Sequence, residues 1–286
     1  MPSVPPTILL VDPAHFDVSY AINPWMQPGA WARDPAGMQA AARRAFDALR
    51  AALEGAGCRV LVRPGAPRLP DMVFPANAAV VLNGRALVAR FRHPQRRGEE
   101  AIFLAMFERL REEGVLTEVA QLPEGCYQEG AGDCIWDATR GHFWGGYGPR
   151  SSRAAIDAIA QFFGREVVPL ELISDRCYHL DVGFCPLSGG EILYFPPALS
   201  EEALRTLHAR VPAEKRIEAG EDELRHFSVN AVCVGRRIIM SRTTPRLREE
   251  LSERGYKVIE VDLAPFILSG GGAFCMTLRL DLAVQA

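Results

Sequence analysis

The sequence lacks the paired cysteines on which disulfide scaffolds and zinc sites depend. Its seven cysteines form an odd set, and no two of them stand in a Cys-x-x-Cys pair. A disulfide framework normally uses an even number of cysteines, and a structural zinc site needs closely spaced pairs of ligands. We therefore expect neither, and interpret most of the cysteines as small apolar side chains of a core.

The sequence also lacks a basic patch, a leader and a membrane span. Its formal net charge is -3, and its positive side chains, almost all arginine, are scattered among acidic ones. This distribution excludes the electrostatic footprint of a nucleic-acid-binding protein. Residues 1–7 do not resemble a signal peptide, and no run approaches the roughly 18 apolar residues of a membrane span. We expect a cytoplasmic protein with no nucleic-acid or membrane partner.

Short strand-like runs alternate with helical stretches along the chain, which is typical of an α/β fold. The 286 residues are 48% hydrophobic, enough for a full core. The pattern predicts strands over residues 8–11, 59–62, 79–88, 166–172, 192–195, 230–240 and 256–261. It predicts helices over residues 35–54, 98–113, 151–163, 201–211 and 245–255.

The predicted helices recur at a regular spacing. Ser151 and Ser200 can act as N-caps, and glycines close the C-terminal ends of four helices: Gly57, Gly114, Gly164 and Gly255. Helix starts are roughly 45 to 65 residues apart, and no break in composition marks a domain boundary. We expect a single domain over residues 1–286, built from about five similar α/β modules. A doubly wound open sheet would show the same alternation.

A glycine-rich segment near the C-terminal end holds a candidate nucleophile. Residues 269–277 read Ser-Gly-Gly-Gly-Ala-Phe-Cys-Met-Thr, so three glycines precede Cys275 closely. Glycines let the backbone approach a ligand, and backbone N–H groups can hold developing charge. The alternative interpretation of this segment is a glycine-rich turn that leads into a buried strand.

A thiol attacks as its thiolate, so Cys275 needs a histidine or a cationic substrate nearby. Among six histidines, His179 stands in Tyr-His-Leu-Asp, which we predict to be extended, with His179 and Asp181 on one face. Such a pair is a general acid/base with a charge partner. The other histidines stand in contexts typical of surface or core residues.

Carboxylates beside turn residues form a possible site for a planar cation. Asp71 follows a proline, and Glu129 and Asp133 flank Gly-Ala-Gly. A guanidinium has several N–H donors in a fixed fork, so it needs acceptors from different parts of the chain. Asp71, Glu129 and Asp181 can supply them. Each acid also has a simpler interpretation as a turn former or a surface charge.

Taken in order, these segments resemble the guanidino-group modifying enzymes, which include arginine deiminases, amidinotransferases and dimethylargininases. The closer resemblance is to bacterial arginine dihydrolases and covers nearly the whole chain. It is carried by residues 22–26 (Ile-Asn-Pro-Trp-Met), 70–78, 96–100, 145–150, 178–187 and 227–231.

The resemblance implies a fivefold pseudosymmetric α/β propeller with its active site at the centre. It implies that Cys275 attacks the guanidinium carbon of a small-molecule substrate, free arginine or a derivative, and that His179 shuttles protons. The remaining positions that it assigns to substrate binding are Glu129, Asp71 and Asp181 for the guanidinium, Arg96 and Arg150 for the carboxylate, and Asn23. It implies no metal or other cofactor.

Asn77 separates the dihydrolases from their relatives, because deiminases and dimethylargininases resemble this segment but have an aspartate there. An asparagine offers a donor and an acceptor, and so can also hold a neutral ureido group. The resemblance then implies a second round of chemistry that ends at ornithine, carbon dioxide and ammonia. The alternatives are a deiminase or dimethylargininase that stops at citrulline, with Asn77 a turn-stabilising residue.

Two departures and two further alternatives remain. Pro75 and Phe274 stand where the similar arginine dihydrolases have a threonine and a basic residue. Phe274 adjoins the candidate nucleophile, so its difference bears on substrate choice more than on reaction type. Because the sequence has 286 residues, we expect it not to include the ornithine-processing domain that is sometimes fused to them. A ribosome anti-association factor also uses this propeller and needs no nucleophile. The helix-rich periphery fits a monomer as well as a homo-oligomer.

Overall fold

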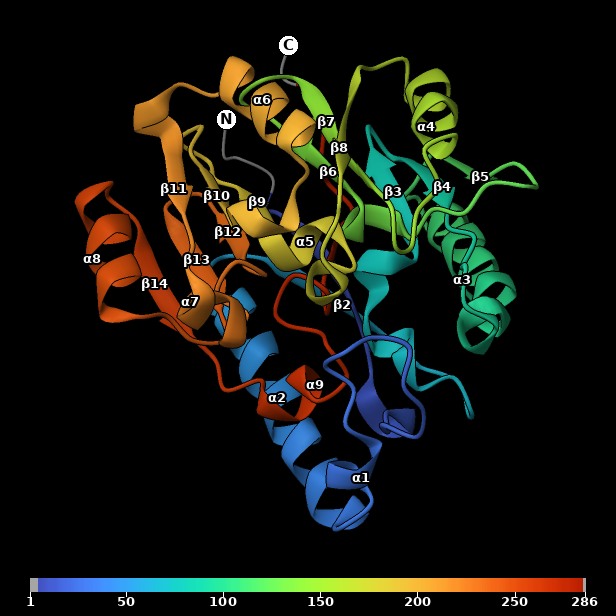
Figure 1. Cartoon of the computed structure of the whole chain (residues 1–286). Helices are drawn as coiled ribbons and strands as arrows, with labels where there is room; N and C mark the ends of the chain where they lie inside the picture. Colours follow the sequence, from blue (N-terminus) through green and yellow to red (C-terminus); the bar gives the residue numbers. More distant parts are fainter. Residues whose placement is uncertain (1–4, 285–286) are drawn as a thin grey trace.

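The computed structural model describes residues 5–284, so most of the segment in which we expected no leader lies outside the described residues. Within this range the strands form five three-stranded sheets. The helices α2, α3, α4, α6 and α8 stand around the outside of the molecule, with short turns near its middle (Figure 1). No helix among the described residues has the length and apolar character needed to cross a membrane.

Each sheet is one β-β-α-β module. Its middle strand pairs antiparallel with the preceding strand and parallel with the strand that follows the helix. Four modules are continuous in sequence: β3 (Ala79–Leu82), β4 (Arg85–Val88), α3 (Pro94–Glu112) and β5 (Glu118–Gln121); β6 (Cys134–Asp137), β7 (His142–Tyr147), α4 (Ala155–Phe163) and β8 (Val167–Glu171); β9 (Phe184–Pro186), β10 (Ile192–Tyr194), α6 (Glu201–Arg210) and β11 (Arg216–Glu218); β12 (Val232–Val234), β13 (Arg237–Met240), α8 (Pro245–Glu253) and β14 (Lys257–Glu260).

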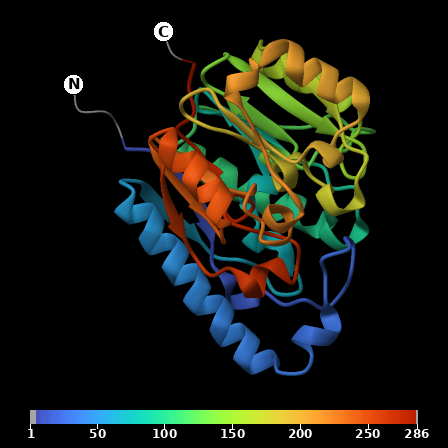
Figure 2. The ribbon, with the colours of Figure 1, turned by 60° about the vertical axis from the view of Figure 1, so that its left-hand side comes forward.

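The fifth module closes the ring by joining the two ends of the chain. It consists of β15 (Leu278–Arg279), β1 (Thr7–Val11), α2 (Pro35–Gly55) and β2 (Arg59–Arg63). Strand β15 pairs antiparallel with β1, and β1 pairs parallel with β2. The long helix α2 runs along the outer edge of the molecule, in contact with α9 (Ala264–Ile267) (Figure 2). The fold is the fivefold α/β propeller that we expected.

Local sequence explains where the helices begin and end. The hydroxyl of Ser200 accepts a hydrogen bond from the N–H of Ala203, as an N-cap does, and Thr244 does the same for Leu247. Four glycines end the helices in the left-handed conformation: Gly57, Gly114, Gly164 and Gly255. These four ends and the Ser200 cap are confirmed.

Three expectations about local structure were wrong in detail. Ser151 is not an N-cap, because α4 begins four residues later at Ala155 and the Ser151 hydroxyl donates instead to Asp133. The predicted strands 79–88 and 230–240 are each a hairpin of two strands. Helix α3 begins at Pro94 rather than residue 98, since proline is well suited to the first helical position.

The core lies between each helix and its sheet and continues from module to module. Its largest buried side chains include Trp144, Tyr194, Phe103, Phe107 and Phe266. Some strands are buried along their whole length, such as the first strand β3 and the middle strand β10. Strands buried on both faces need no polar alternation. This packing fixes the strand ends, from which the functional turns project.

Candidate active site

Six of the predicted site residues share one position in the modules, the turn immediately before the first strand, whereas Asn23, Arg96 and Arg150 lie elsewhere. Asp71 and Asn77 lie in the turns η2 (Pro70–Val73) and η3 (Pro75–Asn77) before β3, and Glu129 directly precedes η4 (Gly130–Gly132) before β6. His179 and Asp181 precede β9, Asp181 within the short helix α5 (Leu180–Gly183), which Figure 1 places near the middle of the molecule. Cys275 precedes β15. Pseudosymmetry therefore gathers residues that are far apart in sequence.

Residues 178–181 are not the extended segment that we predicted. His179 has extended backbone angles, but Leu180 starts α5, so His179 and Asp181 do not share a strand face. The reason is a tertiary contact: the carboxylate of Asp133 accepts a hydrogen bond from the backbone N–H of Leu180 at 2.8 Å. Capping of this turn by Asp133 outweighs the alternating pattern of the sequence.

Asp181 is the partner of the cysteine rather than of the histidine. The Sγ atom of Cys275 lies 3.1 Å from Oδ2 of Asp181 and 3.0 Å from Nδ2 of Asn230. Burial, and after it the negative charge of Asp181, raise the pKa of the Cys275 thiol well above its usual value. Burial also raises the pKa of Asp181, to about 7. The free site therefore disfavours the thiolate, and a cation beside Asp181 would favour it.

His179 takes Glu129 as its charge partner. Nε2 of His179 lies 2.7 Å from Oε2 of Glu129, which also accepts a hydrogen bond from Nη1 of Arg150 at 2.9 Å. Burial alone would raise the pKa of Glu129, but the positive charge of Arg150 and the contact with His179 hold it well below its usual range. Glu129 is thus an ionised carboxylate that orients the imidazole.

A buried ion pair sets the orientation of Asn77. Arg96 lies in the first turn of α3 and Glu99 in the second, and Arg96 donates to both carboxylate oxygens of Glu99, at 2.9 and 2.8 Å. Nη1 of Arg96 also donates to Oδ1 of Asn77 at 2.8 Å. Because a guanidinium only donates, this contact identifies the amide oxygen and turns Nδ2 toward Nδ1 of His179, 3.4 Å away.

The remaining predicted residues lie where a segment from the N-terminal part of the chain crosses the glycine-rich loop. Asp71 accepts hydrogen bonds from Tyr20 at 2.8 Å and Ser269 at 3.1 Å. Asn23 donates to the carbonyl oxygen of Ser269 at 3.0 Å. Gly270 has a φ of +89°, and a Cβ atom there would lie 2.7 Å from Oδ1 of Asn23. The glycine allows this close crossing.

The structure brings the predicted residues together but joins them through side chains that we did not predict. These side chains are Asn230, Glu99, Tyr20 and Ser269. For Asn230 a signal existed, because its segment belongs to the resemblance and lies before a first strand. Glu99 also falls within a resembling segment, whereas nothing in the pattern around Tyr20 indicates a site.

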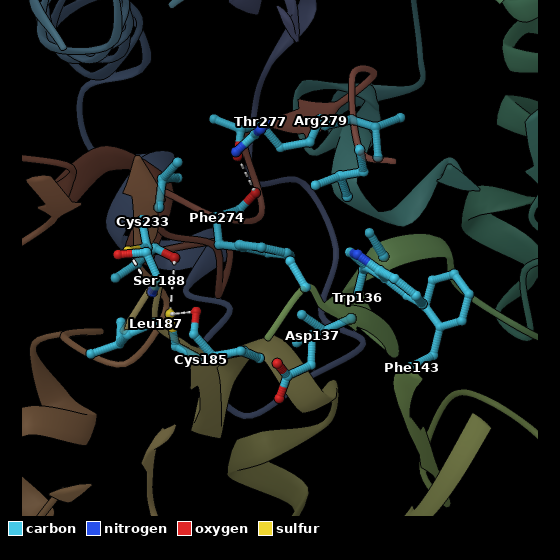
Figure 3. A pocket seen from close by; sticks show the side chains of 18 of the residues that line it. Trp136, Asp137, Phe143, Cys185, Leu187, Ser188, Cys233, Phe274, Thr277 and Arg279 are labelled. Carbon is cyan, nitrogen blue, oxygen red and sulfur yellow. Dashed lines mark hydrogen bonds between the residues drawn. The ribbon is translucent and has the colours of Figure 1, made fainter. Parts of the chain in front are cut away.

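A separate cavity of about 540 Å³ lies beyond the nucleophile loop, and its lining includes none of the predicted site residues. Phe274 and Trp136 lie on facing sides of it (Figure 3). The hydroxyl of Thr277 donates to the carbonyl oxygen of Phe274 at 2.9 Å, which fixes the bend that contains Cys275. Among residues 5–284, no three His, Cys, Asp or Glu side chains gather as metal ligands would.

Comparison with known proteins places this site in a family. A model of the eukaryotic N,N-dimethylarginine dimethylhydrolases matches residues 13–282. The chain belongs to this family. It is 32% identical to the N(G),N(G)-dimethylarginine dimethylaminohydrolase of Mycobacterium tuberculosis, over 95% of this chain and 84% of that protein. The resemblance to guanidino-group modifying enzymes is thereby confirmed.

Dihydrolases within the same group are more similar to the chain. It is 42% identical to the bifunctional arginine dihydrolase/ornithine cyclodeaminase ArgZ of Synechocystis sp., over 96% of this chain, but spans only 37% of the length of that relative. The crystal structure of the N-terminal domain of an ArgZ mutant with bound substrate matches with a TM-score of 0.90 at 39% identity, covering 98% of this chain and 100% of that domain. The chain thus corresponds to the N-terminal domain of ArgZ.

Proposed function

We propose that the chain is an arginine dihydrolase, which hydrolyses the guanidino group of free L-arginine through a covalent intermediate on Cys275. The observation that carries this proposal is the contact between Cys275 and Asp181. The second oxygen of Asp181, Oδ1, is buried and has no hydrogen-bond partner among the described residues. It offers an acceptor for a guanidinium N–H group directly beside the nucleophile.

The substrate itself supplies the charge that activates the cysteine. Because burial and Asp181 raise the pKa of the thiol, the thiolate is disfavoured in the free site. A guanidinium cation bound against the carboxylates of Asp181, Asp71 and Glu129 reverses this balance, since an opposite charge nearby favours the ionised thiol. The arrangement therefore favours a cationic substrate over a neutral one in the first step.

The first round of chemistry ends at citrulline. The thiolate of Cys275 attacks the guanidinium carbon, and the departing nitrogen takes a proton from His179 and leaves as ammonia. Water, deprotonated by His179, then attacks the same carbon of the S-alkylthiouronium intermediate and displaces the sulfur. His179 is protonated and deprotonated in turn during these steps, and Glu129 stabilises its protonated form.

Asn77 allows a second round on the ureido group of citrulline. Its Nδ2 faces the site because Arg96 holds its oxygen, so it can donate to the ureido oxygen as negative charge develops there. Attack by Cys275 expels the second ammonia and leaves an alkyl thiocarbamate. Water releases this as a carbamate, which loses carbon dioxide to give ornithine.

The carboxylate of the amino acid binds to Arg96, Arg150 and Asn23 in this proposal. Arg150 now donates through Nη2 to the carbonyl oxygen of Ile22 at 3.1 Å, and a substrate carboxylate would replace that weaker acceptor. Arg96 already donates to Glu99, Asn77 and the carbonyl oxygen of Asp71, so it contributes through the second N–H of Nη1. Both guanidinium groups are buried, which strengthens such charge-assisted contacts.

A dimethylargininase or deiminase that stops at citrulline is the second candidate, favoured by the matching family model and the mycobacterial relative. The ribosome-binding alternative does not explain a buried cluster around Cys275. A product assay separates the candidates: purified protein with L-arginine, scored for ornithine, citrulline and ammonia. Ornithine with a double yield of ammonia supports the dihydrolase, and citrulline alone contradicts it. Dimethylarginine as the only substrate consumed would also contradict it.

A further inference from the structure

Asn230 lies within the candidate active site, in contact with the sulfur of Cys275. It is fully buried, and it occupies the turn before β12, the one module that supplies none of the predicted site residues. The turns before the other four first strands carry Asp71 and Asn77, Glu129, His179 and Asp181, and Cys275. Its place in the ring is thus that of a functional residue.

Every hydrogen-bonding position of the Asn230 amide is used. Oδ1 accepts from the backbone N–H groups of Phe274 and Cys275, at 3.0 and 3.2 Å. Nδ2 donates to Sγ of Cys275 at 3.0 Å and to the carbonyl oxygen of Asp181 at 3.1 Å. Because backbone N–H groups only donate, the orientation of the amide is fixed, with its nitrogen toward the sulfur.

The glycine-rich loop is built onto this amide. A Cβ atom at Gly272 would lie 2.7 Å from Oδ1 of Asn230, so only a glycine lets the loop come this close. At Gly271 a Cβ atom would collide with the ring of Phe74. The second and third glycines before Cys275 therefore serve packing of the loop against Phe74 and Asn230.

We propose that Asn230 is the positioning residue of the nucleophile: it holds the backbone of Cys275 in place and donates a hydrogen bond that stabilises the thiolate. The proposal rests on the proposed role of Cys275 as nucleophile. Among the described residues, Sγ has two side-chain partners, the acceptor Asp181 and the donor Asn230. When a substrate cation pairs with Asp181, the hydrogen bond that Asn230 donates to the sulfur of Cys275 remains.

The other ionisable groups around the sulfur oppose this stabilisation or are neutral. Burial and the carboxylate of Asp181 raise the pKa of the Cys275 thiol, whereas donation by Asn230 lowers it. Tyr178 also faces the cysteine, and burial raises the pKa of its phenol well above the usual value, so it carries no charge. The backbone N–H of Gly272 also lowers the pKa of the thiol, so loss of the Asn230 donor removes the side-chain hydrogen bond that favours the thiolate and leaves this backbone contact alone.

The test measures alkylation of Cys275 by iodoacetamide between about pH 6 and 10, without substrate, resolved from the other cysteines by peptide mass spectrometry. A hydrogen bond to a charged group is worth about one pKa unit or more. We expect Asn230→Ala to label roughly tenfold more slowly than wild type at about pH 8, with its pH profile displaced upward. Asn83→Gly removes an exposed asparagine at φ +52° and serves as control.

Asn230→Asp guards against a misfolded alanine variant. Aspartate keeps the shape of the side chain and both acceptor contacts to the loop, but it replaces the donor by a negative charge. We therefore expect the pH profile of labelling to be displaced further upward than in Asn230→Ala. With arginine, folded variants should lose kcat and keep KM nearly unchanged, because Asn230 touches the nucleophile and not the substrate. Folded variants that label at the wild-type rate would overturn the inference.

Labelling requires no turnover, so the two proposals can fail separately. A wild-type protein that does not consume arginine would contradict the proposed function and leave the labelling comparison intact. A wild type that forms ornithine, together with unchanged labelling of the Asn230 variants, would contradict the role of Asn230 alone.

Discussion

At the scale of single residues, the site separates the nucleophile from the base. Cys275 contacts Asp181 and Asn230, whereas His179 contacts Glu129 and Asn77, and no hydrogen bond joins the two sets among the described residues. A cysteine activated by a neighbouring histidine would form a direct contact with it. Here the substrate must bridge the two sets, which makes activation of the thiol depend on the charge of the substrate.

Replacement of the nucleophile is the first prediction at this scale. We expect Cys275→Ala to lower kcat for arginine by about 10⁴-fold or more, because no other group can form the covalent intermediate. The unfolding midpoint should change little, since alanine keeps the Cβ atom and removes only the sulfur with its two polar contacts. Cys177→Ala, at a fully buried cysteine outside the site, is the matched control and should stay active. Substantial turnover by Cys275→Ala would end the proposed mechanism.

The second prediction concerns the product. We expect Asn77→Asp to shift the product from ornithine toward citrulline, because a carboxylate cannot donate to a neutral ureido oxygen and prefers the guanidinium cation. Arg96 would pair with the new carboxylate, so the fold should be retained. Chromatography of the products from labelled arginine measures the ratio, with Asn83→Asp as an exposed control. Unchanged ornithine output would remove Asn77 from the mechanism.

At the scale of elements, periodicity in the sequence was sufficient for the five outer helices and most middle strands, because each has one continuous buried face. It failed for residues 178–181, where Asp133 from another module caps α5. Periodicity also gave no indication of Asn230, because the role of this residue depends on its contacts with Cys275, which is distant in sequence. Contacts between modules determine the conformation of these turns, and the local sequence contains no pattern from which such contacts can be predicted.

The turn that carries His179 and Asp181 is therefore sensitive to Asp133. We expect Asp133→Ala to cost about 2 to 3 kcal/mol of unfolding free energy, since it leaves the buried N–H of Leu180 and the hydroxyl of Ser151 without acceptors. Activity should fall as well, because α5 loses its cap. Urea unfolding and kinetics measure both effects. Asp157→Ala, on the exposed face of α4, should show neither.

At the scale of the whole molecule, the site depends on closure of the ring. The turns of all five modules converge, but the nucleophile precedes β15, the two-residue strand that returns to β1. The N–H of Leu280 donates to Thr7, and the N–H of Thr7 donates to Asp281. Residues at opposite ends of the sequence thus place Cys275. The order of the motifs in the sequence indicated the family. The pairing of β15 with β1 explains why the last motif, which contains Cys275, lies next to the others.

Weakening this closure should disable the enzyme before it unfolds the other modules. Leu278 is buried in a cluster with Leu9 and Met72. We expect Leu278→Ala to cost about 2 to 5 kcal/mol of unfolding free energy through the cavity it leaves. Because β15 follows the nucleophile loop directly, activity should be lost at a lower urea concentration than the far-UV circular-dichroism signal. Ile173→Ala, at a side chain that is 63% exposed, is the control in which both transitions should stay as in wild type. If activity and circular dichroism instead fall together in Leu278→Ala, the ring opens as one cooperative unit and the closing strand is no weaker than the rest.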